Sequence, residues 1–295
     1  MESSYLKLVE DCYNCPTHRL FGKSLHFDLH SVSTPENIIV NDFPLMTHKR
    51  ISLHNVKEEL KFFLRGETDV RKLQSKNVHI WDQNASIDFK QKHNLRLSEY
   101  DLGPVYGSQW THWQCNSAGH VIDQVQQVAK ELASNPLSRQ CCISGWNPEY
   151  IHFMNPTCSR PMVLPPCHTL YQLLLELVET NSYKIHAILF QRSGDLLLGI
   201  PYNIASVSLF TLYMIQYIKN YNTNMTINTG SITIHFGDLH IYPEQLSVVS
   251  ELLQRPTHSL PRLSMTLNPK NILESTVTLL DYNSEPKLSI PLICN

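Results

Sequence analysis

Cys167 and His168 are neighbours in an LPPCH segment, and they are the residues of this chain best suited to nucleophilic chemistry. A cysteine reacts as its thiolate, which nearby positive charge favours, and arginine supplies a charge that it cannot lose. Arg192 stands in a second segment, QRSGD, and Asn203 stands in a third, PYNIAS. An asparagine amide both donates and accepts hydrogen bonds, as recognition of a base edge requires. The three segments therefore indicate a nucleophile, a cation for an anionic group, and a side chain that recognises a heterocycle.

The composition is that of an ordinary folded protein. The chain has 295 residues, of which 42% are hydrophobic and 17% are charged. That length is enough for one large domain or two small ones with a sizeable core. The net charge of −2 provides no positive field that would attract nucleic acid or an anionic membrane. We therefore predict no membrane association and no specific nucleic-acid partner.

The eight cysteines are scattered and form no disulfide framework, and no signal peptide opens the sequence. We expect reduced thiols and a cytoplasmic protein, with the nucleus as the alternative compartment. Cys12 and Cys15 form half of a zinc pattern without a second half, and the 15 histidines form no convincing ligand pair. We predict no metal.

Hydrophobic periodicity predicts several elements without a regular alternation of strand and helix, which favours the α+β class. The apolar stretch 204–218 is shorter than the ~20 residues that cross a bilayer, so it predicts a buried helix. The pattern of 170–178 fits either element. We further expect helices at 56–64, with Gly66 as its stop, and at 121–132, ending near Asn135 and Pro136; strands at 141–144, 185–190 and 231–236; and surface loops at 84–100 and 156–161.

Four more segments accompany these motifs in a fixed order: FPLMTHKR (43–50), IWD (80–82), DLGPVYG (101–107) and GDLHIY (237–242). With them, the chain resembles the thymidylate synthase family from Phe21 to its C-terminus. The resemblance implies one thymidylate synthase-like domain over residues 1–295, with a mixed β-sheet flanked by helices and a sheet face at the dimer interface. It makes 170–178 a strand. It also implies a homodimer with shared active sites that methylates dUMP to dTMP, with 5,10-methylenetetrahydrofolate as cosubstrate.

The family's catalytic residues match four positions here. Cys167 matches the nucleophile that adds to C6 of uracil and makes C5 reactive. Glu59 matches a glutamate that organises water and proton transfer, while Tyr106 and His168 match parts of the same proton network. Without the resemblance, Cys167 would be interpreted as a structural cysteine and Glu59 as a solvated residue.

The substrate and cosubstrate positions also match. Arg192 and Ser193 correspond to phosphate ligands, and His240 and Tyr242 to ligands of the 3′-hydroxyl. Asn203 indicates uracil, because relatives that hydroxymethylate dCMP have aspartate there. The alternative role of Asp195 is helix capping. The alternative role of Trp81 and Tyr202 is packing in the core. The substrate-binding set is Arg139, Gln140, Arg192, Ser193, Gly194, Asp195, Asn203, His240 and Tyr242, and the cosubstrate-binding set is Asp195, Trp81 and Tyr202.

The chain departs from its family in two places. The usual DRTGTGT loop is DCYNCPT here, so that Cys12 replaces a phosphate-binding arginine and both glycines are lost. The second of two arginines that reach across the dimer is Gln140. We expect Arg192, Ser193 and Arg139 of the partner subunit to bind phosphate, with Arg19 or Lys23 as substitutes for the lost arginines.

Two alternatives to a synthase remain at this point. A hydroxymethylase of the same fold would trap the methylene group with water and would form no dihydrofolate. A catalytically impaired binding protein derived from the family would explain the altered loop. Retention of Cys167, Arg192 and Asn203 favours the synthase.

Overall fold

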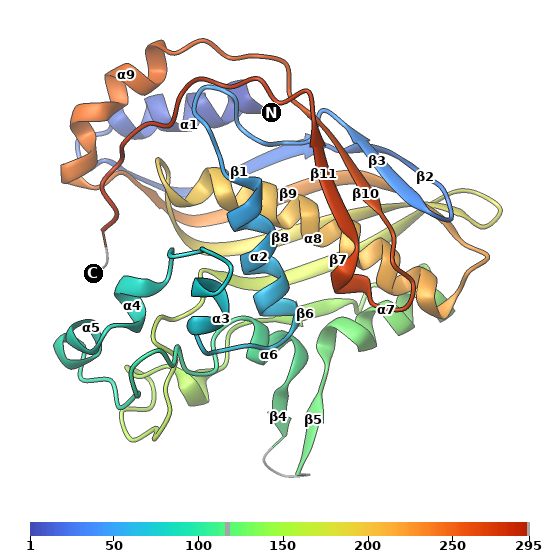
Figure 1. Cartoon of the computed structure of the whole chain (residues 1–295), viewed down its shortest axis with the longest axis horizontal. Helices are drawn as coiled ribbons and strands as arrows, with labels where there is room; N and C mark the ends of the chain where they lie inside the picture. Colours follow the sequence, from blue (N-terminus) through green and yellow to red (C-terminus); the bar gives the residue numbers. More distant parts are fainter. Residues whose placement is uncertain (116–118, 294–295) are drawn as a thin grey trace.

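A five-stranded sheet lies at the centre of the computed structural model, which describes residues 1–115 and 119–293 (Figure 1). Its order is β1–β9–β8–β7–β6, and neighbouring strands are antiparallel except β8 and β9, which are parallel. A mixed sheet with helices packed on it confirms the predicted α+β class. The strands are β1 (Arg19–Asp28), β6 (Cys142–Ser144), β7 (His168–Glu179), β8 (Ser182–Asp195) and β9 (Thr226–His240).

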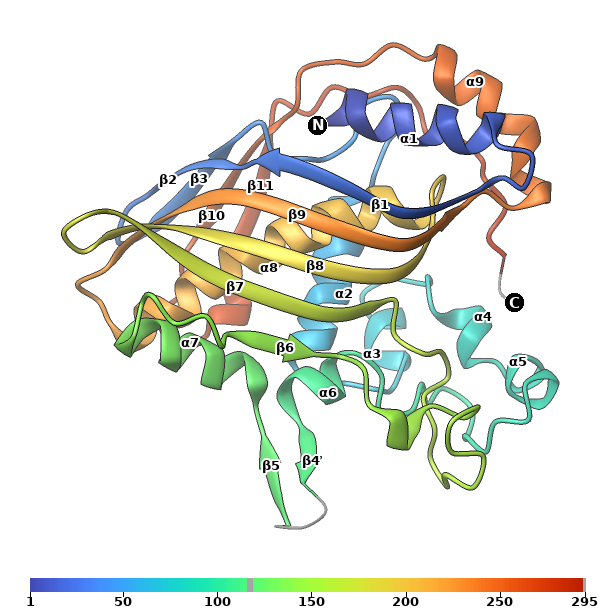
Figure 2. The same cartoon turned by 180° about the vertical axis from the view of Figure 1, so that it is seen from behind.

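The two faces of this sheet have different surroundings. On one face the register aligns Leu25, Ile234 and Leu189, which are all buried. One residue further along, Leu170 pairs with Phe190 on the opposite face, and the two residues are 40% and 47% exposed. Figure 2 shows β7, β8 and β9 in front of α8 and α2, so these helices cover only one face of the sheet.

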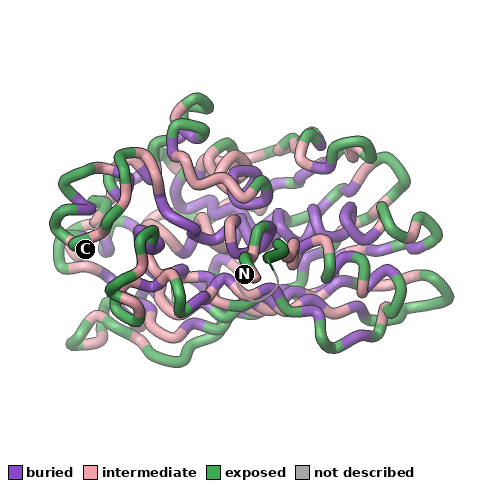
Figure 3. Tube along the Cα trace, turned by 90° about the horizontal axis from the view of Figure 1, so that it is seen from below, coloured by how far each residue is buried: buried purple, intermediate pink, exposed green. Residues whose placement is uncertain are grey.

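The long helix α8 (Gly199–Tyr221) forms the core with the covered face, and every residue from 204 to 218 is buried. A helix that is apolar on all sides is stable only inside a protein. Two of its buried hydroxyl groups are satisfied within the helix, since Ser208 donates to Ile204 O at 2.8 Å and Thr211 to Val207 O at 2.9 Å. Figure 3 shows buried residues through the middle of the molecule and exposed ones in the outer loops. The predicted buried helix is confirmed.

Smaller elements surround this centre. A four-stranded antiparallel sheet has the order β11–β10–β3–β2, and β4 and β5 form a separate pair. No helix in the described part of the chain is long and apolar enough to cross a membrane. The strands are β2 (His30–Ser33), β3 (Asn37–Asn41), β4 (Trp113–Cys115), β5 (His120–Ile122), β10 (Arg262–Thr266) and β11 (Thr276–Leu280), and the helices are α1 (Glu2–Asn14), α2 (Leu53–Leu64), α3 (Arg71–Gln74), α4 (Asp82–Ala85), α5 (Ile87–Lys92), α6 (Gly107–Thr111), α7 (Gln124–Ser134) and α9 (Val249–Gln254).

Most predicted elements are confirmed, with boundaries that differ from the predictions. Helix α2 includes 56–64 and is followed by Gly66 at φ +68°, a backbone conformation that suits glycine. The segment 156–161 contains no helix or strand. The strands predicted at 185–190 and 231–236 are the middles of longer strands, and those at 170–178 and 141–144 correspond to β7 and β6.

Two local predictions were wrong. The helix predicted from Val121 begins at Gln124, because the Asp123 side chain accepts the N–H of Gln126 at 2.9 Å and starts the helix there. Val121 instead lies in β5 and is 47% exposed. The segment 84–100 is not simply a loop, because it includes the end of α4 and all of α5. Lys90 in α5 is buried, and its amine donates to Ala85 O and Ser98 O at 2.6 and 2.7 Å.

Candidate active site

Cys167 lies immediately before β7, and Arg192 on the neighbouring strand holds it from two directions. The Arg192 backbone N–H donates to Cys167 O at 2.9 Å. Its guanidinium donates from Nε to Pro166 O at 3.0 Å and from Nη2 to Pro165 O at 2.6 Å. Nη2 also lies 3.9 Å from the Cys167 Sγ. The two proline carbonyls therefore fix a permanent positive charge beside the thiol.

Tyr106 holds the backbone of Cys167 from the other side. Its hydroxyl accepts the Cys167 N–H at 3.0 Å, and its ring stacks on Phe63 with 4.8 Å between centroids. Burial raises the pKa of Tyr106 well above its usual range, and the neighbouring Cys167 raises it further. Tyr106 has φ +24° and ψ −85°, a backbone conformation that is costly for tyrosine and that often occurs at functional sites.

Glu59 is the carboxyl group of this region. Burial raises its pKa to about 7, although the Trp81 Nε1–H, which donates to Glu59 Oε1 at 2.8 Å, opposes the rise. A carboxyl group that titrates near neutral pH can both give and take a proton. The Trp81 ring lies 6.0 Å from the Tyr106 ring, so the structure brings Glu59, Trp81 and Tyr106 close together.

His168 and Asn203 belong to one hydrogen-bonded network. Burial lowers the pKa of His168 to about 4, against a smaller raising effect of its hydrogen bond with Asn203, so the imidazole is neutral. Its Nδ1 lies 3.1 Å from the Tyr171 hydroxyl. Gln191 Nε2 donates to Asn203 Oδ1 at 3.0 Å. The Asn203 amide therefore has two side-chain partners, His168 and Gln191, and Gln191 is a neighbour that stands in the QRSGD motif but was given no role from the sequence.

The ends of β8 and β9 bring the predicted phosphate and ribose ligands side by side. Parallel pairing aligns Ser193 with Asp238, Gly194 with Leu239, and Asp195 with His240. Because the Gly194 side chain is only a hydrogen, Ile200 packs directly on the end of β8. A Cβ at position 194 would lie 2.3 Å from Ile200 Cδ1.

His240 and Tyr242 meet edge to face beyond these strand ends, with 4.8 Å between ring centroids and 77° between planes. Asp195 also stabilises the chain locally. Its Oδ1 accepts the N–H groups of Leu197 and Leu198 at 2.9 Å each, and its Oδ2 accepts from Gln245 Nε2 at 2.8 Å. Asp195 therefore caps the turn before α8, and a contact with the cosubstrate stays a prediction.

Tyr202 lies in the first turn of α8 and is half-buried. Burial raises its pKa, a backbone hydrogen bond with Ser52 lowers it, and the nearby Glu59 raises it. A contact of Tyr202 with the cosubstrate stays a prediction.

Arg139 and Gln140 are not close to the other predicted site residues. Both are exposed in the loop before β6, and Gln172 Nε2 on β7 donates to Arg139 O at 3.1 Å. Gln172 is five residues after Cys167 on an extended strand, a separation of about 16 Å. Arg139 therefore lies far along the sheet from Cys167 of its own chain.

The altered N-terminal segment has no free phosphate-binding arginine. Cys12 is a buried residue of α1, and its Sγ lies 3.9 Å from Leu239 O. Arg19, considered above as a substitute, pairs with Asp238. Burial raises the pKa of Cys12 to about 12, so it packs as a neutral thiol.

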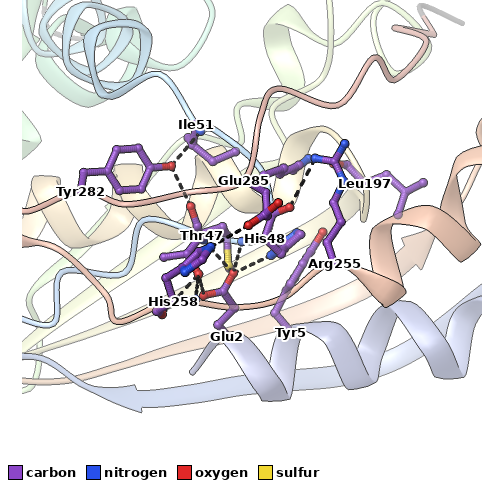
Figure 4. Close-up of polar contacts among 12 residues, drawn as sticks. Glu2, Tyr5, Thr47, His48, Ile51, Leu197, Arg255, His258, Tyr282 and Glu285 are labelled. Carbon is purple, nitrogen blue, oxygen red and sulfur yellow. Dashed lines mark hydrogen bonds and ion pairs between the residues drawn. The ribbon is translucent and has the colours of Figure 1, made fainter.

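A second buried cluster positions the segment 43–50 beside this site (Figure 4). The Glu2 carboxylate accepts the N–H and hydroxyl of Thr47, both at 2.7 Å, and the N–H of His48 at 2.9 Å. Burial alone would raise the pKa of Glu2, but the hydrogen bonds from His48 and Thr47 lower it. Lys49 follows in the chain, and its amine donates to Leu197 O, next to Asp195. Burial lowers the pKa of Lys49 to about 8, so the sequence analysis missed a buried cation although it quoted the motif that contains it.

The described residues contain no group of three or more acidic, histidine or cysteine side chains that could hold a metal ion. The seven described cysteines are free, and Cys294 lies outside the described residues.

Comparison with known proteins gives one consistent result. The family model described as thymidylate synthase matches residues 7–294. "Thymidylate synthase 1/2" of Encephalitozoon cuniculi (strain GB-M1) is 32% identical over 98% of this chain and 96% of its own length. Thymidylate synthase of varicella-zoster virus (strain Dumas) is 33% identical over 99% of this chain and 94% of its own. The chain also matches 55% of a bifunctional dihydrofolate reductase-thymidylate synthase of Leishmania major at 31% identity.

Proposed function

The chain belongs to the thymidylate synthase family, and from this premise we propose that it converts dUMP to dTMP with Cys167 as the nucleophile. One observation supports the proposal most strongly. Cys167 is held between the Arg192 guanidinium and the Tyr106 hydroxyl, in a site that also contains a carboxyl group with a pKa of about 7. A structural cysteine requires none of these neighbours.

In the proposed reaction the Cys167 thiolate forms a bond to C6 of uracil. The electron pair of the C5–C6 double bond moves to O4, and the resulting enolate makes C5 nucleophilic. C5 attacks the methylene group of 5,10-methylenetetrahydrofolate and then loses its proton, and cleavage of the bond from that methylene to the folate nitrogen leaves an exocyclic methylene group on the base. Transfer of a hydride from the released tetrahydrofolate to this group breaks the sulfur–C6 bond, which gives dTMP and dihydrofolate and regenerates the thiolate.

Glu59 is the group best suited to move protons near O4 and C5. Its pKa of about 7 makes both protonation states accessible at neutral pH. Tyr106, with its pKa far above neutrality, keeps its hydroxyl proton and serves as a fixed hydrogen-bonding group. Neutral His168 holds the Asn203 amide rather than exchanging protons itself.

Asn203 would recognise uracil, donating to O4 and accepting from N3–H. Gln191 Nε2 donates a hydrogen bond to Asn203 Oδ1, and this bond fixes which way the Asn203 side chain is turned. Arg192 and Ser193 would bind the phosphate, and His240 and Tyr242 the 3′-hydroxyl. Trp81 and Tyr202 present aromatic faces near Glu59, which suit the flat pterin ring of the cosubstrate.

We also propose a homodimer over the full 1–295 domain with shared active sites. The sheet face opposite α8 exposes Leu170 and Phe190 as a paired apolar surface. Large apolar side chains exposed next to each other often lie in a protein interface. Arg139 lies about 16 Å along that sheet from Cys167 of its own chain, so Arg139 would serve the partner subunit's site. The free thiols support a reducing compartment, the cytoplasm or the nucleus.

The decisive experiment incubates labelled dUMP with 5,10-methylenetetrahydrofolate and purified protein and identifies the nucleotide product. We expect labelled dTMP with an equal amount of dihydrofolate. Hydroxymethyl-dUMP without dihydrofolate would instead indicate a hydroxymethylase, and binding without turnover would indicate the impaired protein. Cys167→Ser is the matched control, and it should abolish dTMP formation while leaving nucleotide binding and the dimer intact. Unchanged turnover in Cys167→Ser would overturn the mechanism.

A further inference from the structure

Arg19 connects the altered N-terminal segment to the ribose end of the site. It stands on β1 directly opposite His240 on β9. Its guanidinium does not point to open solvent alone, because Nε donates to Asp238 Oδ2 at 3.0 Å and Nη2 donates to the same oxygen. The other carboxylate oxygen, Oδ1, lies 3.3 Å from His240 Nδ1. Asp238 therefore bridges Arg19 and His240.

This bridge determines which nitrogen of His240 faces the substrate side. A carboxylate only accepts hydrogen bonds, so Nδ1 must carry the proton that it shares with Asp238. In a neutral imidazole Nε2 is then the acceptor, as a hydroxyl donor requires. The Tyr242 ring packs edge to face against the imidazole and limits its rotation.

Arg19 completes the arrangement by fixing Asp238. Asp238 and His240 are mostly buried, with 19% and 17% of their side chains exposed, whereas the Arg19 side chain is 53% exposed. Two guanidinium N–H groups on Oδ2 leave Oδ1 as the oxygen available to His240. Without Arg19, the carboxylate could turn either oxygen toward solvent and release the imidazole.

We propose that Arg19 is a positioning residue for the ribose of the substrate, acting through Asp238 on the tautomer and orientation of His240. The proposal rests on the proposed function, in which His240 binds the 3′-hydroxyl. It differs from the expectation that Arg19 replaces a lost phosphate ligand, since the guanidinium has an acidic partner in this structure.

Three ligands separate the two roles: dUMP, deoxyuridine, which lacks the phosphate, and 2′,3′-dideoxyuridine 5′-monophosphate, which lacks the 3′-hydroxyl. Dissociation constants are measured by calorimetry for wild type and Arg19→Ala. We expect Arg19→Ala to weaken dUMP and deoxyuridine by about fivefold to tenfold, the effect of one poorly aligned hydrogen bond, and to leave the dideoxynucleotide unchanged. The same loss should appear in the KM for dUMP, and Arg19→Lys should restore part of it.

The matched control is Arg262→Ala. Arg262 also donates from Nε and Nη2 to one carboxylate oxygen, that of Asp281, and its side chain is 54% exposed. It lies on β10, outside the predicted site, so all three affinities should stay at wild-type values.

Two results would overturn the proposal. Equal weakening of dUMP and the dideoxynucleotide, with deoxyuridine unchanged, would show that Arg19 binds phosphate directly. No change for any ligand would leave Arg19 as a surface ion pair. Failure of the proposed function is distinguishable from both, because wild type itself would then form no dTMP and show no preference for a 3′-hydroxyl.

Discussion

Single residues in this site differ from their ordinary chemistry because of where the fold places them. Glu59 has a pKa of about 7 instead of 4.5, while His168 has a pKa of about 4 instead of 6.5. In both cases burial disfavours the charged form. Both protonation states of the carboxyl group are thus accessible at neutral pH, as an acid–base role would require, and the imidazole is neutral.

The substitution Glu59→Gln tests the raised pKa of Glu59 through the pH dependence of folding stability. Because the folded-state pKa lies above 4.5, the folded protein holds a proton that the unfolded chain releases as pH rises from about 4.5 to 7. The stabilising contribution is therefore present below this window and lost above it. We expect the free energy of unfolding to fall between about pH 5 and pH 8 by roughly 2 kcal/mol more in wild type than in Glu59→Gln. Denaturant titrations at the two pH values measure the difference, and parallel behaviour of the two proteins would contradict it.

Asn203 is the residue on which base preference should depend. Asn203→Asp replaces the amide by a carboxyl group that, when protonated, presents the pattern complementary to cytosine. We expect the ratio of kcat/KM for dUMP over dCMP to fall about tenfold or more. The control is Gln191→Glu, the same amide-to-carboxyl change in the residue that hydrogen-bonds Asn203. It should lower activity without favouring dCMP. An unmoved ratio in Asn203→Asp would mean that Asn203 does not recognise the base.

At the scale of elements, the contact between α2 and α6 positions Tyr106. Gly107, the first residue of α6, packs so closely on α2 that a Cβ there would lie 2.0 Å from Phe63 O. The stacking of the neighbouring Tyr106 ring on the Phe63 ring depends on this close packing of α6 on α2. Two short helices therefore hold the hydroxyl that meets the Cys167 N–H.

Gly107→Ala should separate these helices. Because the clash is with backbone, we expect a loss of about 1–3 kcal/mol in the free energy of unfolding. We also expect a fall in kcat, since Tyr106 would move away from Cys167. Ser108→Ala in the same helix is the control and should change neither quantity appreciably. If Gly107→Ala kept the stability and kcat of the wild type, the close packing of Gly107 on α2 would be unimportant.

At the scale of the whole molecule, the sheet has one face for the core and one face that α8 and α2 leave uncovered (Figures 1 and 2). Leu170 and Phe190 lie on that second face, and the Arg139 loop lies at its β6 edge. The proposed dimer would bury this face and bring each Arg139 to the other subunit's Cys167.

Mixing two variants tests the shared site. Cys167→Ser lacks the nucleophile, and Arg139→Ala lacks the residue proposed to cross the interface. Random reassortment into heterodimers would restore one complete site in each, and therefore about a quarter of the wild-type number of active sites. Activity of the refolded mixture, compared with each variant alone, measures this. A mixture no more active than the sum of its components would exclude a shared site.

The sequence by itself was enough to predict the chemistry and the strongly patterned elements. Cys167, Arg192 and Asn203 are identifiable because their motifs are contiguous, and the helix at 204–218 is identifiable because its apolar run is continuous. Side-chain type and short-range pattern are local properties, so they can be found without a fold.

Tertiary structure decided what depends on partners distant in the chain. Arg19 meets Asp238 across 219 positions, and the strand lengths follow from pairing with neighbours rather than from local alternation. Helix α5 was missed because Lys90 looks solvent-exposed in sequence, and only the fold supplies the carbonyl groups that satisfy its buried amine. The pKa of Glu59 likewise depends on the packing that removes water from a carboxyl group, which cannot be seen in a helix sequence that also contains Glu58. Burial and long-range pairing are properties of the folded chain, and they convert identifiable residues into a site.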